Sequence, residues 1–195
     1  MAVKVVVFDV GETLVDETGM WERAADAAGV PRFTLMGVLG GLAARGEPLS
    51  NVWEILAVRR PASTWDPVDF YADALPCLAR LRSRGLLVGA AGNTPAATEE
   101  LLREHVDLVG SSGRWRIEKP APEFFERMIA EAACGPSELV YVGDRVDNDV
   151  VPAVHAGLVA IHIRRGPWGY LQDGADRAHA QIASLDELPE AFRGL

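Results

Sequence analysis

The sequence predicts an α/β fold in which helices flank a parallel β-sheet, with a small all-helical insertion after the first strand. Two observations support the sheet. Short apolar runs such as residues 5–8, rich in β-branched side chains, are typical of strands buried on both faces. Segments of helical periodicity separate these runs, and strands joined by such crossovers run parallel. The insertion is indicated by residues 17–70, where helical segments follow one another without an intervening strand.

Length and composition restrict the class of protein. The chain has 195 residues, 49% of them hydrophobic, and a net charge of −9. These values fit one folded α/β domain with a small insertion and exclude a disordered protein. The negative charge argues against nucleic-acid and membrane partners. Cys77 and Cys134 are isolated, and the first residues lack a signal-peptide pattern, so we expect a cytoplasmic monomer or homodimer.

The first part of the chain contains the insertion. Three segments of helical periodicity follow the strand at residues 5–8, and the Pro-rich stretch at residues 59–67 is typical of a returning linker. We therefore expect residues 1–16 and 71–195 to form the core domain and residues 17–70 to form a reduced helical cap. The three expected helices are residues 21–28, 33–44 and 49–58.

After residue 73 the expected helices and strands alternate regularly, with Gly or Pro at most boundaries. A capping-box pattern at residues 184–187 starts a last short helix. The other expected helices are residues 73–85, 95–104 and 122–133 and one that ends at residue 156, and the strands are residues 86–91, 108–109, 139–142 and 158–163.

Polar residues stand directly after several of these strands or just before a helix. Because the carboxyl ends of parallel strands meet at one edge of a sheet, we expect these side chains to converge on one crevice. They are Asp9, the turn of Gly92, Asn93 and Thr94, then Lys119, and finally Asp144, Asp147 and Asp149.

This set of residues predicts a site for a metal ion and an anion. Several carboxylates in one crevice repel one another unless a cation neutralises them, and their hard oxygen ligands favour Mg²⁺. Lys119 supplies a positive charge that can hold a phosphate oxygen. The amides of residues 92–94, at the start of a predicted helix, can form a cradle for an anion.

With these residues the sequence resembles the haloacid dehalogenase superfamily, which consists mostly of Mg²⁺-dependent phosphatases that work through an aspartyl-phosphate. The resemblance covers nearly the whole chain and implies a Rossmann-like core with a helical cap. It rests on the motifs FDVGETL, GNT, EKP and YVGDRVDNDVVPAVHAGL.

The resemblance also assigns roles to individual residues. It makes Asp9 the nucleophile and a metal ligand, and Lys119 the charge-balancing lysine. Asp144 and the backbone carbonyl of Gly11 become metal ligands, and Asp149 becomes either a further ligand or an acid that supports the ligands. The implied activity is hydrolysis of a small phosphorylated metabolite.

Two positions depart from the family pattern. Family phosphatases usually carry a second aspartate, the general acid and base, where this chain has Gly11, and a Ser or Thr where it has Gly92. Proton transfer contributes about 10²- to 10⁴-fold to such reactions, so we expect slow turnover. A non-catalytic or regulatory protein that binds metal and phosphate is therefore an alternative, and a 2-haloacid dehalogenase is a further one.

Two neighbouring features have less defined roles. The position of Glu12 favours solvation of a turn or a helix start. The segment 164–169 follows the last predicted central strand, and two interpretations stay open: it rims the crevice, or it is a surface loop anchored by Trp168.

Overall fold

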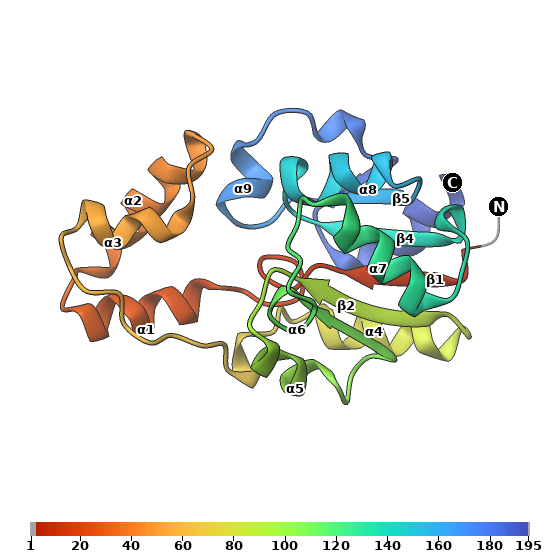
Figure 1. Ribbon diagram of the computed structural model, residues 1–195, viewed down its shortest axis with the longest axis horizontal. Coiled ribbons are helices and arrows are strands. Elements are labelled where there is room, and N and C mark those ends of the chain that lie inside the picture. Colours follow the sequence, from red (N-terminus) through yellow and green to blue (C-terminus); the bar gives the residue numbers. More distant parts are fainter. Residues whose placement is uncertain (1–2, 195) are drawn as a thin grey trace.

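The computed structural model describes residues 3–194, and its centre is one six-stranded sheet (Figure 1). All neighbouring strands pair in parallel, in the order β3-β2-β1-β4-β5-β6. The predicted α/β class is therefore confirmed. The strands are β1 (Val5–Phe8), β2 (Leu87–Gly92), β3 (Leu108–Ser111), β4 (Leu139–Gly143), β5 (Val159–Ile163) and β6 (Ala180–Ile182).

β1 is one of the two central strands, and both of its faces are covered. Val6 and Phe8 belong to an apolar cluster with residues of α4 (Ala74–Ser83), whereas Val5 and Val7 belong to a second cluster with residues of α7 (Pro122–Ala132). This alternation follows from the two-residue period of a strand. The continuous apolar run is needed because neither face of β1 meets solvent.

Short helices complete the layers around the sheet. Their bounds are α5 (Glu99–Leu102), α6 (Ser112–Trp115), α8 (Val151–His155), α9 (Gly166–Leu171) and α10 (Leu188–Ala191).

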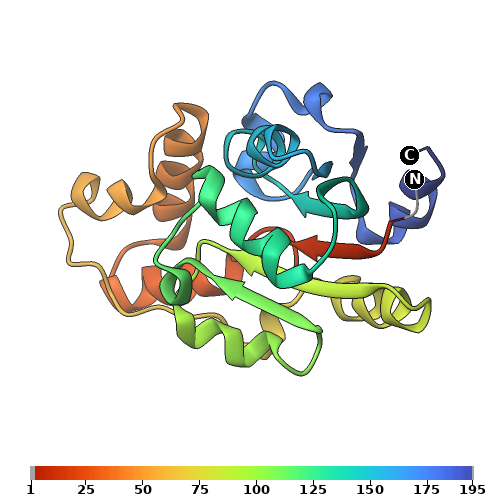
Figure 2. The same ribbon diagram turned by 45° about the vertical axis from the view of Figure 1, so that its right-hand side comes forward.

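A helical insertion lies beyond the carboxyl ends of the strands, as Figures 1 and 2 both show. It consists of α1 (Thr18–Ala28), α2 (Arg32–Ala44) and α3 (Val52–Ile55), which pack around a separate apolar cluster. α2 also contacts α9 of the core. The insertion thus places its own side chains above the edge of the sheet where the polar residues were expected.

The chain leaves for the insertion and returns from it along paired segments. The N–H of Asp16 donates to the carbonyl of Asp69 (2.7 Å), and the N–H of Tyr71 donates to the carbonyl of Leu14 (2.9 Å). Arg23 of α1 forms an ion pair with the buried Asp69 (2.5 Å). The backbone hydrogen bonds fix the base of the insertion to the core, and the ion pair joins α1 to the returning segment.

Several elements differ from the sequence prediction. Strand β6 was not predicted, and the segment 164–169 enters helix α9 rather than a loop. The helix expected at residues 95–104 is reduced to a 3-10 turn and the four residues of α5. A π-helical turn, Val146–Val150, precedes α8. Within residues 3–194, no helix is both long and apolar enough to cross a membrane.

Candidate active site

The polar residues predicted to converge do meet at one edge of the sheet. Asp9 follows β1, and Asp144 follows β4, the strand paired with β1. Lys119 reaches the same edge from the loop before α7. All three line a cavity of about 270 Å³. The carboxyl ends of neighbouring parallel strands therefore build this site, as expected for an open α/β sheet.

Lys119 is the buried cation of the site. Its Nζ donates to Oδ1 of Asp9 (2.7 Å), to Oδ1 of Asp149 (2.5 Å) and to the hydroxyl of Tyr141 (3.0 Å). Burial lowers the pKa of this ammonium, but the carboxylates of Asp149 and Asp9 outweigh burial and hold the pKa well above its usual value. Lys119 therefore stays charged and balances two carboxylates.

The three acids fit a divalent cation. Asp9, Asp144 and Asp149 each offer a carboxylate oxygen, and these oxygens lie within 4.8 Å of one another. Oδ2 of Asp144 is buried and accepts no hydrogen bond within residues 3–194. Burial, together with the charges of Asp149 and Asp9, raises the pKa of Asp144 well above its usual value. A bound cation would relieve both the missing contact and the repulsion.

The acidic segment after β4 contributes Asp149 but not Asp147. An ideal Cβ built on Gly143 would lie 2.5 Å from the carboxyl carbon of Asp149, so only glycine lets this side chain approach the strand end. Oδ2 of Asp149 accepts from the N–H of Arg145 (3.0 Å). Asp147 instead forms an ion pair with Arg145 (2.8 Å) and is half-exposed. Asp147 therefore does not belong to the carboxylate cluster.

The turn after β2 holds Lys119 and leaves room for Asp9. Asn93 Nδ2 donates to the carbonyl of Lys119 (2.9 Å), and the N–H of Lys119 donates to Asn93 Oδ1 (2.8 Å). An ideal Cβ built on Gly92 would lie 2.6 Å from Oδ1 of Asp9. The N–H of Thr94 donates to the carbonyl of Gly92 (2.9 Å) and so is engaged inside the turn. The N–H of Thr94 is thus not free to bind an anion, so fewer amides are available for the anion cradle than the sequence predicts.

Glu12 has a structural role, in agreement with its expected place in a turn. Its carboxylate accepts from the hydroxyl of Tyr71 (2.6 Å) and from the N–H of Glu17 (3.1 Å). Burial raises the pKa of Glu12, and these hydrogen bonds oppose that shift. Both carboxylate oxygens are engaged where the chain enters and leaves the insertion.

The segment 164–169 rims the site, as one of the two interpretations expected, but it enters a helix instead of forming a surface loop. Arg165 is buried, donates to the carbonyl of Thr13 (2.8 Å) and pairs with Asp73. Trp168 of α9 lines the 270 Å³ cavity, and the guanidinium of Arg145 lies 4.0 Å from the centre of its ring. The segment is therefore an anchored helix that rims the site.

Glu17 lies over Gly11, at the position where the family that the sequence resembles usually has its second aspartate. An ideal Cβ built on Gly11 would lie 2.5 Å from Oε1 of Glu17. The other oxygen, Oε2, accepts from the indole N–H of Trp21 (3.1 Å). Burial and the charge of Glu12 raise the pKa of Glu17 to about 7. The sequence prediction missed this residue, which lines the same cavity as Asp9.

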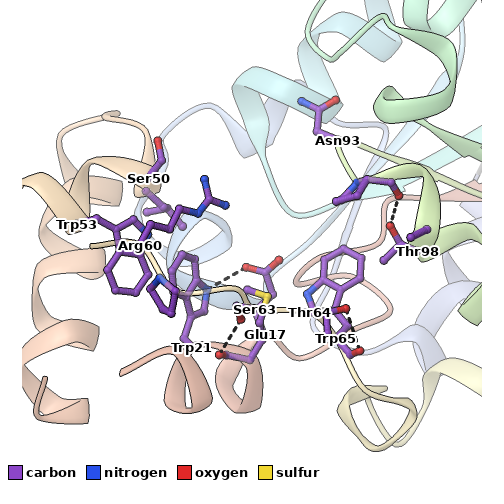
Figure 3. Close-up of a pocket in the computed structure, with 15 residues that line it drawn as sticks. Glu17, Trp21, Ser50, Trp53, Arg60, Ser63, Thr64, Trp65, Asn93 and Thr98 are labelled. Atoms are coloured by element: carbon purple, nitrogen blue, oxygen red, sulfur yellow. Dashed lines mark hydrogen bonds between the residues drawn. The ribbon is translucent and has the colours of Figure 1, made fainter. Parts of the chain in front are cut away.

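A larger aromatic cavity of about 470 Å³ adjoins the site (Figure 3). Trp21, Trp53 and Trp65 line it, and Arg60 is its charged residue from the returning linker. Glu17 and Asn93 line both this aromatic cavity and the cavity of Asp9. The two cavities therefore adjoin, and Glu17 is part of the lining that they share.

Sequence reasoning also missed two buried side chains that position the site. Tyr141 donates from its hydroxyl to the carbonyl of Ala91 (2.9 Å) while it accepts from Lys119. Nε2 of His162 lies 2.9 Å from the backbone oxygen of Asp144. Both residues lie inside otherwise apolar strands. A polar side chain within a buried run was the one feature of the sequence that could have indicated them.

Comparisons with known proteins relate the chain to hydrolases. A family model described as haloacid dehalogenase-like hydrolase matches residues 3–157. The chain is 36% identical over 104 residues to a glyceraldehyde 3-phosphate phosphatase of Methanopyrus kandleri, covering 50% of this chain and 45% of the relative. It is 34% identical over 102 residues to a phosphoserine phosphatase of Thermus thermophilus, covering 49% and 41%. The chain thus spans about half the length of these curated relatives.

Solved structures share the fold over nearly the whole chain. A phosphatase from Thermococcus onnurineus has a TM-score of 0.67 at 22% identity, covering 98% of this chain and 99% of its own. An L-2-haloacid dehalogenase from Xanthobacter autotrophicus has a TM-score of 0.69 at 18% identity, covering 99% of both chains. At these identities the likeness extends to the fold alone.

Proposed function

Because this chain belongs to the haloacid dehalogenase-like hydrolase family, we propose that it is a Mg²⁺-dependent phosphatase that acts on small phosphorylated metabolites. The buried cluster of Asp9, Asp144, Asp149 and Lys119 carries the proposal. Three acids and one lysine leave the cluster with excess negative charge, and one oxygen of Asp144 lacks a partner within residues 3–194. Such a cluster suits a cation and a phosphoryl group together.

Each residue has a defined task in this mechanism. A carboxylate oxygen of Asp9 attacks phosphorus, the bond to the leaving oxygen breaks, and an aspartyl-phosphate forms. Water then attacks the same phosphorus, which releases phosphate and restores Asp9. Lys119 holds a phosphoryl oxygen and keeps Asp9 oriented, supported by the clamp from Asn93. The backbone N–H of Asn93 and the Thr94 hydroxyl complete the proposed phosphate contacts.

The metal would be held by Asp9, the Gly11 carbonyl, Asp144 and Asp149. When bound, Mg²⁺ supplies electrostatic stabilisation for the charge that develops on the transferred phosphoryl group. The carboxylate cluster also separates this proposal from a metal-independent dehalogenase, which has no use for the partnerless oxygen of Asp144. A non-catalytic metal- and phosphate-binding protein is the second candidate, favoured by the missing side chain at Gly11.

We further propose that residues 17–70 act as a cap over a core of residues 1–16 and 71–195. The cap side chains line the aromatic cavity and so face the leaving group of a bound substrate. Two relatives are named for glyceraldehyde 3-phosphate and phosphoserine, which makes small phosphorylated metabolites the first substrates to test. The net charge of −9 fits such a small-molecule partner.

Phosphate release from a panel of phosphorylated metabolites, with Mg²⁺ and with EDTA, tests the proposal. Turnover should require Mg²⁺ and disappear in Asp9→Asn. Calorimetry with Mg²⁺ should lose its signal in Asp144→Ala but keep it in Asp147→Asn, a matched control because Asp147 lies outside the cluster. Vanadate should bind more weakly to Lys119→Ala. Metal binding without turnover on any substrate would favour the non-catalytic candidate.

A further inference from the structure

We infer that Glu17 is the general acid and base of this site and takes the place of the side chain that Gly11 lacks. The inference rests on the proposed phosphatase function and names the group that transfers the proton in that reaction. Glu17 comes from the insertion, just before α1, whereas the family's usual aspartate belongs to the loop after β1.

The position of the carboxyl group carries the inference. Oε1 of Glu17 lies 2.5 Å from the point where a Cβ of residue 11 would stand. An acidic oxygen therefore occupies the space into which a side chain at position 11 would extend. Glu17 lines the cavity that Asp9, Lys119 and Asp144 also line. No other acid of the insertion lines that cavity within residues 3–194.

One hydrogen bond holds the Glu17 backbone in place, and a second holds its carboxyl group. The N–H of Glu17 donates to Oε1 of Glu12 (3.1 Å), which fixes the backbone at the start of α1. The indole N–H of Trp21 donates to Oε2 (3.1 Å), as Figure 3 shows. The Trp21 ring packs in turn near Trp53, with ring centres 6.2 Å apart. Oε1 is the oxygen that remains over Gly11.

The aromatic cavity explains why an acid is useful at this point. The phosphoryl group lies between Asp9 and Lys119 in the proposed mechanism, and the leaving group extends into the cavity lined by Trp21, Trp53 and Trp65. Glu17 lines both cavities, so the oxygen that joins phosphorus to the leaving group passes beside it. Proton transfer requires this kind of proximity.

The proton then follows a balanced path. As the bond between Asp9 and phosphorus forms and the bond to the leaving oxygen breaks, protonated Glu17 gives its proton to that oxygen, and the leaving group departs as a neutral alcohol. The Glu17 carboxylate next accepts a proton from the water that attacks the aspartyl-phosphate. Phosphate leaves, Asp9 is free, and Glu17 is protonated again.

A side chain at position 11 and the Glu17 carboxyl group exclude one another in this arrangement. A side chain at position 11 would meet the Glu17 carboxyl group, so one of the two must move. The flexible Glu17 side chain can move away, whereas the backbone at residue 11 cannot. Glycine at position 11 thus leaves the room that the carboxyl group of Glu17, supplied by the insertion, occupies.

Two phosphate esters of similar shape test this role in Glu17→Gln. Phenyl phosphate needs an acid because phenolate is a poor leaving group, whereas p-nitrophenyl phosphate needs little help. We expect kcat on phenyl phosphate to fall about 10²- to 10⁴-fold with little change in KM. On p-nitrophenyl phosphate the variant should release a burst of p-nitrophenol and then slow down, because the aspartyl-phosphate lacks a base. Glu22→Gln is the matched control, because Glu22 is a half-buried acid of α1 that pairs with Arg32 (2.8 Å) and lines neither cavity.

A second variant and two further readouts keep the test decisive. Gly11→Asp combined with Glu17→Ala moves the acid to the family's usual position and should recover much of the kcat lost in Glu17→Gln. Calorimetric Mg²⁺ binding and the melting temperature should stay unchanged in Glu17→Gln. If kcat on phenyl phosphate in Glu17→Gln equals that of the wild type, the role of Glu17 is refuted. Full activity in Asp9→Asn would refute the phosphatase mechanism instead, and a wild type inactive on both esters would refute both.

Discussion

Replacing Lys119 with methionine tests the electrostatic account of the site most directly. Methionine keeps much of the length of the side chain but removes the ammonium. The Lys119 side chain is only 1% exposed, and its Nζ contacts Asp9, Asp149 and Tyr141. The substitution therefore leaves two carboxylates close together in a buried place without their counter-charge.

The size of the effect follows from this burial. Breaking a buried ion pair by removing one partner costs about 3 to 5 kcal/mol. For a protein of this length, each kcal/mol lowers the melting temperature by about 2 to 4 °C. We therefore expect Lys119→Met to melt about 6 to 20 °C below the wild type in the absence of divalent cations.

Thermal unfolding followed by circular dichroism at pH 7 in EDTA measures this shift. Lys4→Met is the matched control, because Lys4 forms its ion pair with Glu138 in solvent and should change the melting temperature little. The double variant Asp9→Asn with Lys119→Met should regain part of the loss, since one of the unbalanced charges is gone. A Lys119→Met protein that melts within about 2 °C of the wild type would refute the electrostatic account.

Three other predictions follow from the same geometry. Mg²⁺ at about 100 times its dissociation constant should stabilise the wild type by about 2.7 kcal/mol, and a thermal shift assay should show no such gain in Asp144→Asn. Gly92→Ser should lower turnover and melting temperature, although the family usually has Ser or Thr there, because its Cβ would lie 2.6 Å from Oδ1 of Asp9; higher turnover would contradict this. Burial tends to raise the pKa of Asp73, but hydrogen bonds from Ser184 and Arg165 outweigh burial and lower this pKa below its usual value. The stability that Asp73 contributes is therefore present above about pH 4 and is lost as the pH falls further. Urea titrations at several pH values should therefore show that the free energy of unfolding falls less with acid in Asp73→Asn than in the wild type.

The strong strand signals predicted the centre of the fold, and weak local signals account for what was missed. Residues 5–8 and 139–142 are continuous apolar runs, and their strands lie at the centre of the sheet. β6 is an edge strand of three residues, too short for a recognisable period. α9 contains Gly166, Pro167 and Gly169, which are more typical of a loop than of a helix.

The residues of the candidate site likewise divide into those that the sequence could predict and one that it could not. Asp9, Lys119, Asp144 and Asp149 could be predicted because each follows a strand or precedes a helix, where topology alone brings side chains together. Glu17 could not, because it lies in the insertion, and its place over Gly11 depends on how that insertion packs. A sequence pattern shows that residue 11 lacks a side chain but not which residue fills the space.

The origin of Glu17 in the insertion links proton transfer to the position of the insertion itself. Glu12 accepts from both Glu17 and Tyr71, so one carboxylate joins the segment that leaves the core to the segment that returns. Arg23 and Asp69 fix the same base from the side of α1. An aspartate at position 11 would stay with the core whatever the insertion did. Glu17 reaches the leaving oxygen only while α1 keeps this place, so packing at the base of the insertion controls the proposed proton transfer.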